Sequence, residues 1–256
     1  LLPLIESKQD RSFLSKAQAG MKKWWELLAK RVARDDVPIK PQLVAEVLSD
    51  LADNDAIISG DSGTNTTWIA RHFKIRGNQK FSCSGNLSTM APGLPYAIAA
   101  KVAFPERQSI AFVGDGGFTM LMGEFATAVK YNLPIVVVII KNNTLGQIKW
   151  EQIVFLGNPE YGCELHPIDF AKFAEACGGL GIRVAQPPEL RPALQAALAS
   201  GRPCVVEVLV DALEPPMPSK VELKQALKFG EALAKGEPNR KQIAVTLFRD
   251  KLNELL

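Results

Sequence analysis

The sequence has no long apolar run and no strong charge imbalance. Its longest apolar stretch, Leu133–Ile140, is far shorter than the roughly 20 residues that a membrane-spanning helix needs. The formal net charge is +3, and basic residues do not alternate with aromatic ones as they do on nucleic-acid-binding surfaces. We therefore expect neither a membrane span nor a nucleic-acid partner.

The first residues, Leu1–Ile5, lack an initiating Met and run into a charged segment, so we expect the chain to be part of a longer protein.

Cysteine is also scarce and spaced without a pattern. No cysteine belongs to a CxxC pair, and free thiols in a reducing compartment, the cytoplasm, are expected rather than a metal or disulfide role. The 4 cysteines are Cys83, Cys163, Cys177 and Cys204.

The composition that remains is that of a globular protein, with 47% hydrophobic and 22% charged residues. We divide the chain into a lead-in (1–38), a core domain (39–212) and a tail (213–256). In the lead-in, apolar residues from Phe13 to Leu28 recur at helical spacing, and the adjacent tryptophans there are expected to pack. The pattern of apolar residues in the tail predicts two helices, and the second helix carries an apolar stripe over Ile243–Leu255. We expect that stripe to pack on the protein itself rather than on a membrane surface.

In the core domain, apolar strands alternate with helices. Ser109–Val113 and Pro134–Ile140 are unbroken apolar strands, and a helix over Phe118–Tyr131 joins them. Such strands indicate a parallel sheet covered on both sides, so the predicted fold is α/β, a doubly wound parallel sheet with helices on both faces. The other expected helices cover Pro41–Ala52, Thr64–His72, Met90–Ala103, Asp169–Cys177 and Pro188–Ala199, and the other strands cover Ala56–Ser59, Lys80–Ser84, Gly181–Ala185 and Cys204–Val210.

Polar residues follow two of these strands at the place where doubly wound sheets bind ligands, outside the carboxyl ends. Asp115 comes after the first strand, and Asn142 and Thr144 come after the second. A carboxylate, an amide oxygen and the backbone carbonyl of Thr144 suit Mg²⁺, with room left for phosphate oxygens and a water. Either segment alone is typical of an ordinary turn, but the two together predict a diphosphate bridged by a metal.

Glycines beside Asp115 suit the same ligand. Gly114, Gly116 and Gly117 surround that aspartate, and the last two stand where the next helix begins. Backbone N–H groups and the helix dipole favour phosphate at such a position, and glycine lets the backbone approach closely.

Together these motifs resemble the cofactor signature of thiamine-diphosphate (ThDP)-dependent enzymes. In that family an Asp, an Asn and the carbonyl two residues after the Asn hold the metal on the cofactor's diphosphate. By position, these become Asp115, Asn142 and Thr144. The resemblance implies cofactor contacts at Asp61, Ser62, Gly63, Thr64, Asn65, Ser88, Met90, Gly114, Gly116, Gly117, Asn142, Leu145 and Gly146.

Two further stretches carry the resemblance. Gly60–Asn65 resembles the turn that touches the diphosphate from a neighbouring strand, and Ser84–Pro95 resembles the family's loop-to-helix segment. In relatives, a bulky apolar residue of that loop forces the cofactor into its bent shape, a role that falls to Met90 here. The backbone at Ser88 and Met90 would hydrogen-bond the aminopyrimidine. Without the family, Met90 would be interpreted as an ordinary core methionine.

Within the family, Gly114–Gly123, Glu164–His166 and Asp169–Val184 look most like pyruvate oxidases and acetolactate synthases. We expect the oxidase branch, acting on pyruvate or a related 2-oxo acid, with an acetolactate synthase-like carboligase as the alternative. An aromatic or small apolar residue is common in relatives at the position of Gln147, which leaves the substrate open. The substrate-pocket candidates are Gln147, Ile148 and Glu151.

The resemblance also implies parts that this sequence does not contain. The family's catalytic glutamate lies in a separate pyrimidine-binding domain, and Glu46, Glu124 and Glu151 stand in the wrong contexts for it. We expect that domain in the same longer chain or in a separate subunit, within a homodimer or homotetramer. FAD would occupy a further domain if the complete enzyme is an oxidase. The chain alone is expected to bind ThDP and Mg²⁺ weakly and not to turn over.

A function of another class is a non-catalytic module that binds a nucleotide phosphate at the same sheet edge. Neither the Rossmann pattern GxGxxG nor the P-loop pattern GxxxxGK[ST] occurs. The enzyme hypothesis is therefore preferred, and tighter binding of ADP or NAD than of ThDP would favour the module.

Overall fold

The described part of the chain forms one parallel sheet with helices around it. The computed structural model describes residue 4 and the ranges 8–216 and 222–255. In these residues the strands follow the order β2-β1-β3-β4-β6-β5, and each is parallel to its neighbours. The strands are β1 (Ile57–Gly60), β2 (Lys80–Ser82), β3 (Ser109–Gly114), β4 (Ile135–Lys141), β5 (Leu180–Val184) and β6 (Cys204–Leu209).

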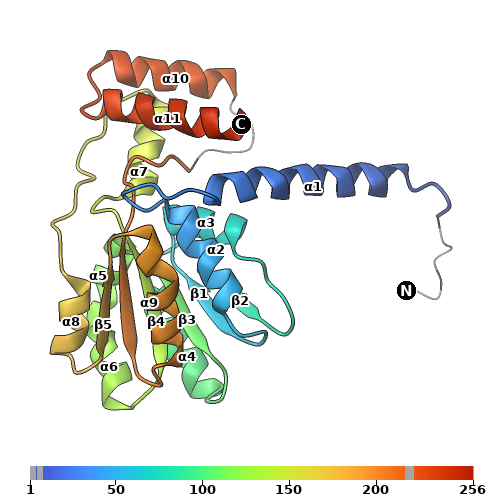
Figure 1. Ribbon diagram of the computed structural model, residues 1–256. Helices are drawn as coiled ribbons and strands as arrows, with labels where there is room; N and C mark the ends of the chain where they lie inside the picture. The colour runs from blue at the N-terminus through green and yellow to red at the C-terminus, as the bar shows by residue number, and fades with distance from the viewer. Residues whose placement is uncertain (1–3, 5–7, 217–221, 256) are drawn as a thin grey trace.

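Each face of the sheet is covered by its own group of helices (Figure 1). One face carries α2 (Pro41–Leu51), α3 (Thr64–His72) and α9 (Pro187–Ala199), and the other carries α4 (Gly93–Ala103), α5 (Asp115–Leu121), α6 (Phe125–Lys130) and α8 (Phe170–Ala176). Phe112 and Val138 face the first group and Val113 and Val137 the second, as the two-residue period of a strand requires. The predicted doubly wound fold is confirmed.

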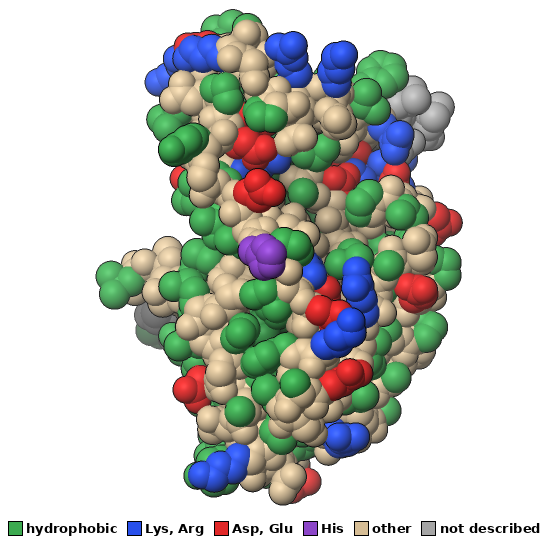
Figure 2. Space-filling view, turned by 90° about the vertical axis from the view of Figure 1, so that its left-hand side faces the viewer, with side chains coloured by type: hydrophobic (Ala, Val, Ile, Leu, Met, Phe, Trp, Pro, Cys, Tyr) green, Lys and Arg blue, Asp and Glu red, His purple; other side chains and the backbone are tan. Residues whose placement is uncertain are grey.

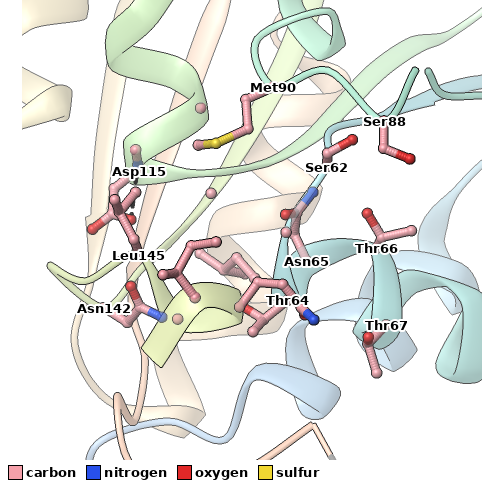
Figure 3. Close-up of a pocket in the computed structure, with 18 of the residues that line it drawn as sticks. Ser62, Thr64, Asn65, Thr66, Thr67, Ser88, Met90, Asp115, Asn142 and Leu145 are labelled. Carbon is pink, nitrogen blue, oxygen red and sulfur yellow. Dashed lines mark hydrogen bonds between the residues drawn. The ribbon is translucent and has the colours of Figure 1, made fainter. Parts of the chain in front are cut away.

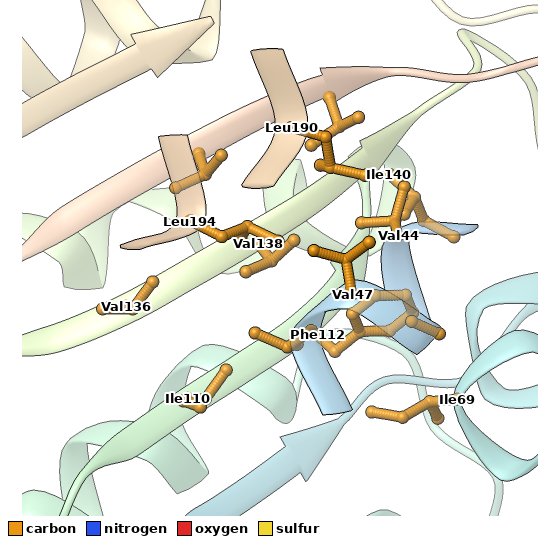
Figure 4. Close-up of a cluster of buried hydrophobic side chains, with 14 of the residues drawn as sticks. Val44, Val47, Ile69, Ile110, Phe112, Val136, Val138, Ile140, Leu190 and Leu194 are labelled. Carbon is orange, nitrogen blue, oxygen red and sulfur yellow. The ribbon is translucent and has the colours of Figure 1, made fainter. Parts of the chain in front are cut away.

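A core of buried side chains lies between the central strands and α2, α3 and α9 (Figure 4). Ile110, Phe112 and Val138 are fully buried there, and Val44 from α2 and Leu194 from α9 pack over them. Full burial of each such side chain stabilises the fold by roughly 1.5–3 kcal/mol. The strand ends that carry the predicted site therefore project from a well-packed layer.

The helix expected over Met90–Ala103 begins later than predicted. It starts at Gly93, because Ala91 adopts a positive φ of 83° that an α-helix cannot contain. Residues 90–92 consequently form a loop at the edge of the sheet, and Met90 lies on a loop instead of on the first helical turn.

The helix expected over Phe118–Tyr131 is interrupted. In its place α5 is followed by a 3₁₀ turn over Met122–Glu124, and α6 continues to Lys130. Gly123 lies inside this turn, and glycine is a poor helix former. The break lets two short helices follow the twisted sheet where one straight helix was predicted.

A helix that we did not predict follows β4. Helix α7 spans Gly146–Glu151 and continues as a π-helical turn over Gln152–Leu156. Its buried residues Trp150 and Ile153 form a third core cluster with Ala232 of α10 (Leu223–Ala234) and Ile243 of α11 (Arg240–Leu255). The tail therefore packs on the helix that follows the predicted metal loop.

The two ends of the chain behave differently. Helix α1 (Ser12–Val32) extends away from the sheet (Figure 1), and Phe13 is 80% exposed. Trp25 is 38% exposed, and the ammonium of Lys74 lies 5.3 Å from the centre of its ring. In α11, Ile243 is buried and Leu247 packs beside it, whereas the side chains of Leu252 and Leu255 lie outside the described residues. The proposed boundaries near residues 38 and 212 stay predictions.

Among the described helices, none combines the length and the apolarity that a bilayer crossing requires. Figure 2 shows hydrophobic side chains spread over one face of the molecule among charged ones.

Candidate functional site

Three turns meet at the carboxyl edge of the sheet. Strand β3 lies between β1 and β4, and Gly114, the last residue of β3, pairs with Ile140 of β4. The turns that begin at Asp61, Asp115 and Asn142 are therefore neighbours. Bringing these distant segments together is what the parallel topology does for the site.

A pocket of about 520 Å³ opens at this edge (Figure 3). Of the predicted site residues, only Asp61 does not line it. The predicted residues that do so are Ser62, Gly63, Thr64, Asn65, Ser88, Met90, Gly114, Asp115, Gly116, Gly117, Asn142, Thr144, Leu145, Gly146, Gln147, Ile148 and Glu151.

Sequence reasoning missed some of the lining. Thr66 and Thr67 continue the first turn of α3 beyond Asn65, and the helical period could have indicated them. Residues 83–85 follow β2, whose carboxyl end lies at the same edge as those of β1 and β3. The rule that ligands lie beyond parallel strand ends applies to that strand as well.

Asp115 is held in place by main-chain donors. Its side chain is buried at 4% exposure, Oδ1 accepts the N–H of Gly116 at 3.0 Å, and Oδ2 accepts the N–H of Asn143 at 2.6 Å. Burial raises the pKa of this carboxyl, and the surrounding N–H groups oppose the shift. In the part of the chain that the structure describes, no lysine or arginine pairs with it.

The loop after β4 is shaped around Asp115. Asn143 takes a positive φ of 54°, which lets its N–H turn back to the carboxylate. The side-chain oxygen of Asn142 accepts the N–H of Thr144 at 3.0 Å. Two further main-chain bonds join the loop to the segment before α8, from Leu145 N to Cys163 O at 2.8 Å and from Leu165 N to Asn143 O at 2.9 Å.

These residues fit a hard divalent cation. Asp115 supplies a buried carboxylate without a cationic partner among the described residues, and Asn142 and Thr144 add an amide and a backbone carbonyl at the same rim. Oxygen ligands of this kind suit Mg²⁺. No group of three or more His, Cys, Asp or Glu side chains that could hold a metal occurs in the described ranges, so a thiolate or imidazole centre is not indicated.

The glycines leave the space that a phosphate would need. A Cβ on Gly116 would lie 3.0 Å from Leu145 and 3.1 Å from Leu165, so a side chain there would crowd the pocket. The expectation of free N–H groups is only partly met, because the N–H of Gly116 donates to Asp115. A Cβ on Gly146 would lie 3.3 Å from the amide nitrogen of Asn142.

Asp61 stands behind the pocket wall, against the prediction that it contacts the cofactor. It is 1% exposed and absent from the lining. Its backbone carbonyl accepts hydrogen bonds from the side-chain amide of Asn65, at 2.7 Å, and from the hydroxyl of Thr66. The sequence placed Asp61 in the right turn, but its side chain turns inward while Ser62 and Gly63 face the pocket.

The loop before α4 presents Met90 to the pocket. Figure 3 shows this side chain reaching toward the start of α5, and a Cβ on Gly116 would lie 3.6 Å from its terminal methyl. Ser88 and Ala91 flank it with φ values of 49° and 83°, positions that residues with a Cβ seldom adopt. The loop is therefore a strained segment that neighbouring groups must hold.

Helix α7 forms the remaining wall. Gln147 donates from Nε2 to Glu151 Oε1 at 2.9 Å, and Ile148 is 46% exposed. Lys149 faces away from the pocket and is 2% exposed, with its ammonium 3.0 Å from Glu160. The polar pair on one side and the apolar Ile148 on the other give the wall a mixed character.

A family model described as "Thiamine pyrophosphate enzyme, C-terminal TPP binding domain" matches residues 61–208. The matched range contains all three turns of the pocket. Thiamine pyrophosphate is another name for ThDP.

Three relatives show how far the similarity extends. The putative thiamine pyrophosphate-containing protein YdaP of Bacillus subtilis is 47% identical over 235 residues, which cover 92% of this chain and 41% of that protein. A probable acetolactate synthase large subunit of Methanococcus aeolicus is 38% identical over 69% of the chain and 31% of its own length. The acetolactate synthase isozyme 3 large subunit of Escherichia coli is 33% identical over 77% of the chain and 36% of its own length.

The chain thus spans 31% to 41% of the length of these relatives. The match of the family model over residues 61–208, together with the geometry of the pocket, shows that the chain belongs to the thiamine pyrophosphate enzymes and contains their C-terminal TPP-binding domain.

Proposed function

We propose that this chain is the diphosphate-binding part of an enzyme that uses ThDP and Mg²⁺ to decarboxylate pyruvate or a related 2-oxo acid. The observation that carries the proposal is that Asp115, Asn142 and Thr144, from the ends of two neighbouring strands, all line one pocket. When bound, ThDP supplies the carbon nucleophile and the electron sink for such a reaction. The residues of this chain bind and orient it.

The positions of the residues in the pocket indicate which part of the cofactor or substrate each would contact. Asp115, Asn142 and the Thr144 carbonyl would hold the cation, and the backbone of Gly117 would approach the diphosphate. Met90, whose side chain reaches toward the start of α5 (Figure 3), would fill the angle between the cofactor's two rings. The Gln147–Glu151 pair and Ile148 would face the substrate.

The comparisons favour one of the two reactions that could follow the decarboxylation of pyruvate, addition to a second 2-oxo acid or oxidation. Relatives from several organisms are named acetolactate synthases, whereas the oxidase branch that we preferred from the sequence gains no specific support. We therefore propose addition to a second 2-oxo acid as the reaction of the complete enzyme, with oxidation through FAD as the alternative. In the proposed reaction two molecules of pyruvate give acetolactate and one CO₂, so no oxidant is needed.

The test of the site is a calorimetric titration of the purified chain with ThDP, with and without Mg²⁺. Binding should require the cation, and Asp115→Ala should weaken it at least about tenfold, because the variant removes the only carboxylate proposed for the metal. Asp50→Ala is the matched control, since Asp50 lies on the exposed face of α2 and pairs with Arg191 there. Unchanged affinity in the Asp115 variant would refute the assignment.

The fate of the substrate is tested separately. The chain is combined with the pyrimidine-binding part of the protein and supplied with pyruvate, ThDP and Mg²⁺. Formation of acetolactate without an added electron acceptor supports the carboligase. Pyruvate consumption that depends on FAD and on an acceptor supports the oxidase instead.

A further inference from the structure

The carboxyl group of Asp61 lies between two segments that both face the pocket. Its Oδ1 accepts the N–H of Ser62 at 2.8 Å, and its Oδ2 has no hydrogen-bond partner in the described residues. A Cβ built on Gly117 would come within 2.0 Å of Oδ2, and one built on Gly93 would lie 3.6 Å from the Asp61 Cβ. The side chain therefore fills the space between the start of α5 and the start of α4.

The loop that ends at α4 needs support of this kind. Ala91 has a φ of 83°, and such a conformation persists only where the surroundings determine it. The Asp61 side chain lies beside this segment, because a Cβ built on Gly93 would be 3.6 Å from the Asp61 Cβ. A second contact holds the same segment, because the Ser59 hydroxyl donates to the carbonyl of Gly93 at 2.7 Å. Both anchors come from the end of β1.

We propose that Asp61 is a positioning residue, whose buried carboxyl holds the loop at residues 88–91 against the start of α5 and so fixes Met90 in the pocket without touching the cofactor. The role in ThDP binding rests on the proposed function, since Met90 matters there only if the pocket takes a bent ThDP. That Asp61 supports the loop is inferred from the position of its side chain between Gly117 and Gly93.

Burial and charge argue against direct contact with the diphosphate. Asp61 is 1% exposed and does not line the pocket. A carboxylate beside a diphosphate would also repel it. Burial raises the pKa of Asp61 to about 6, and the N–H groups of Ser62 and Ala91 act in the opposite direction. The side chain is thus placed where water is excluded and main-chain donors converge.

The first test measures amide hydrogen exchange in the ligand-free 256-residue chain. Asp61→Asn keeps the size of the side chain but replaces one acceptor oxygen with an amide donor. We expect exchange in residues 84–93 to accelerate about tenfold, while the strands β3 and β4 stay protected. Asp50→Asn on the exposed face of α2 is the matched control. Unchanged exchange in residues 84–93 overturns the proposal.

The second test separates positioning from direct binding by comparing ThDP with inorganic diphosphate, each with Mg²⁺. Asp61→Asn and Met90→Ala should weaken ThDP binding about tenfold and leave diphosphate binding within about twofold, whereas Asp115→Ala should weaken both. The double variant of Asp61 and Met90 should bind ThDP no more weakly than Met90→Ala alone, because the two changes act on one contact. Equal loss of both ligands in Asp61→Asn overturns the inference while the proposed function stands.

If the wild-type chain binds neither ligand even when the pyrimidine-binding part is added, the proposed function fails and the exchange result alone decides the inference. If Asp61→Asn does not fold, Gly117→Ala replaces it, since the new Cβ would displace the carboxyl without removing its charge. Faster exchange in residues 84–93 of that variant supports the inference, and unchanged exchange there overturns it.

Discussion

At the scale of single residues, His72 shows how burial sets a proton affinity. The ring is 1% exposed, and its Nδ1 has no partner in the described part of the chain. Burial lowers the pKa of His72 to about 4, and the charges of Arg31, Arg71 and Lys74 add to the effect. An unfolded histidine takes up its proton near pH 6.5. The neutral ring therefore favours the folded state above pH 6.5, and this contribution is lost as the pH falls toward 4.

We predict that His72→Gln makes the stability of the chain less dependent on pH. Between pH 7 and pH 5, the wild type should lose about 2 kcal/mol of unfolding free energy more than the variant, from the difference between the two proton affinities. Urea denaturation at the two pH values measures this. His166→Gln is the control because His166 is exposed. Equal losses in the wild type and the His72 variant would contradict the prediction.

Asp61 and Met90 show where residue-level prediction from sequence ends. The motif placed both residues in the correct turns, because turns after parallel strands meet at one edge. The motif does not show that the Asp61 side chain turns inward. That direction depends on Gly117, which has no side chain to occupy the space that the Asp61 carboxyl fills. The direction of a side chain is fixed by packing from distant segments, which a local pattern does not contain.

At the scale of elements, a buried ion pair joins the metal loop to the rest of the sheet. Lys141, the last residue of β4, lies with its ammonium 2.8 Å from Glu207 of β6, which is 0% exposed. Glu207 also accepts the N–H groups of Phe170, at 2.7 Å, and Ala171, at 3.1 Å, at the start of α8. One carboxylate thus fixes both the end of β4, next to Asn142, and the helix behind it.

We predict that Glu207→Ala destabilises the chain by roughly 3–5 kcal/mol, the usual effect of leaving a buried charge without its partner. The double variant with Lys141→Met should recover part of this loss, because it removes the unpaired ammonium. Denaturant titration of the single and double variants gives both values. Glu46→Ala serves as the control, since its Lys74 partner is about half exposed. No recovery in the double variant would show that the Glu207 bonds to α8 dominate.

The elements themselves were predicted unevenly. Strands β3 and β4 were found because both of their faces are buried, which leaves an unbroken apolar run. Helix α7 was missed because Gly146–Glu151 follows a cofactor motif and mixes polar with apolar residues. Its apolar residues pack on α10 and α11, so the helix is stabilised by contacts far along the chain.

At the scale of the whole molecule, the site is a pocket at one edge of the sheet. The chain spans 31% to 41% of the length of the relatives compared, and Leu87, next in sequence to the lining residue Ser88, is 86% exposed. We infer that a pyrimidine-binding domain completes the pocket, within a homodimer or homotetramer. That domain would supply the glutamate for the aminopyrimidine.

The chain alone should therefore bind ThDP without turning over. We predict no steady consumption of pyruvate by the purified 256-residue chain, and consumption once the pyrimidine-binding part is added. A coupled assay of CO₂ release with and without that part decides the matter. Sustained turnover by the chain alone would mean that a base within residues 1–256 serves in place of the expected glutamate.

The strand order has a consequence for the time course of folding. Asp61, Asp115 and Asn142 become neighbours only after β1 and β4 have both joined β3, and each of these parallel pairings closes a loop that contains two α-helices. Pairings between segments so far apart form slowly, because loop closure costs chain entropy before contacts repay it. A state in which only β3 and β4 had paired would hold the turns at Asp115 and Asn142 but would lack the wall from residues 61–67. Such a state would present the groups proposed for the diphosphate before those proposed for the rest of the cofactor.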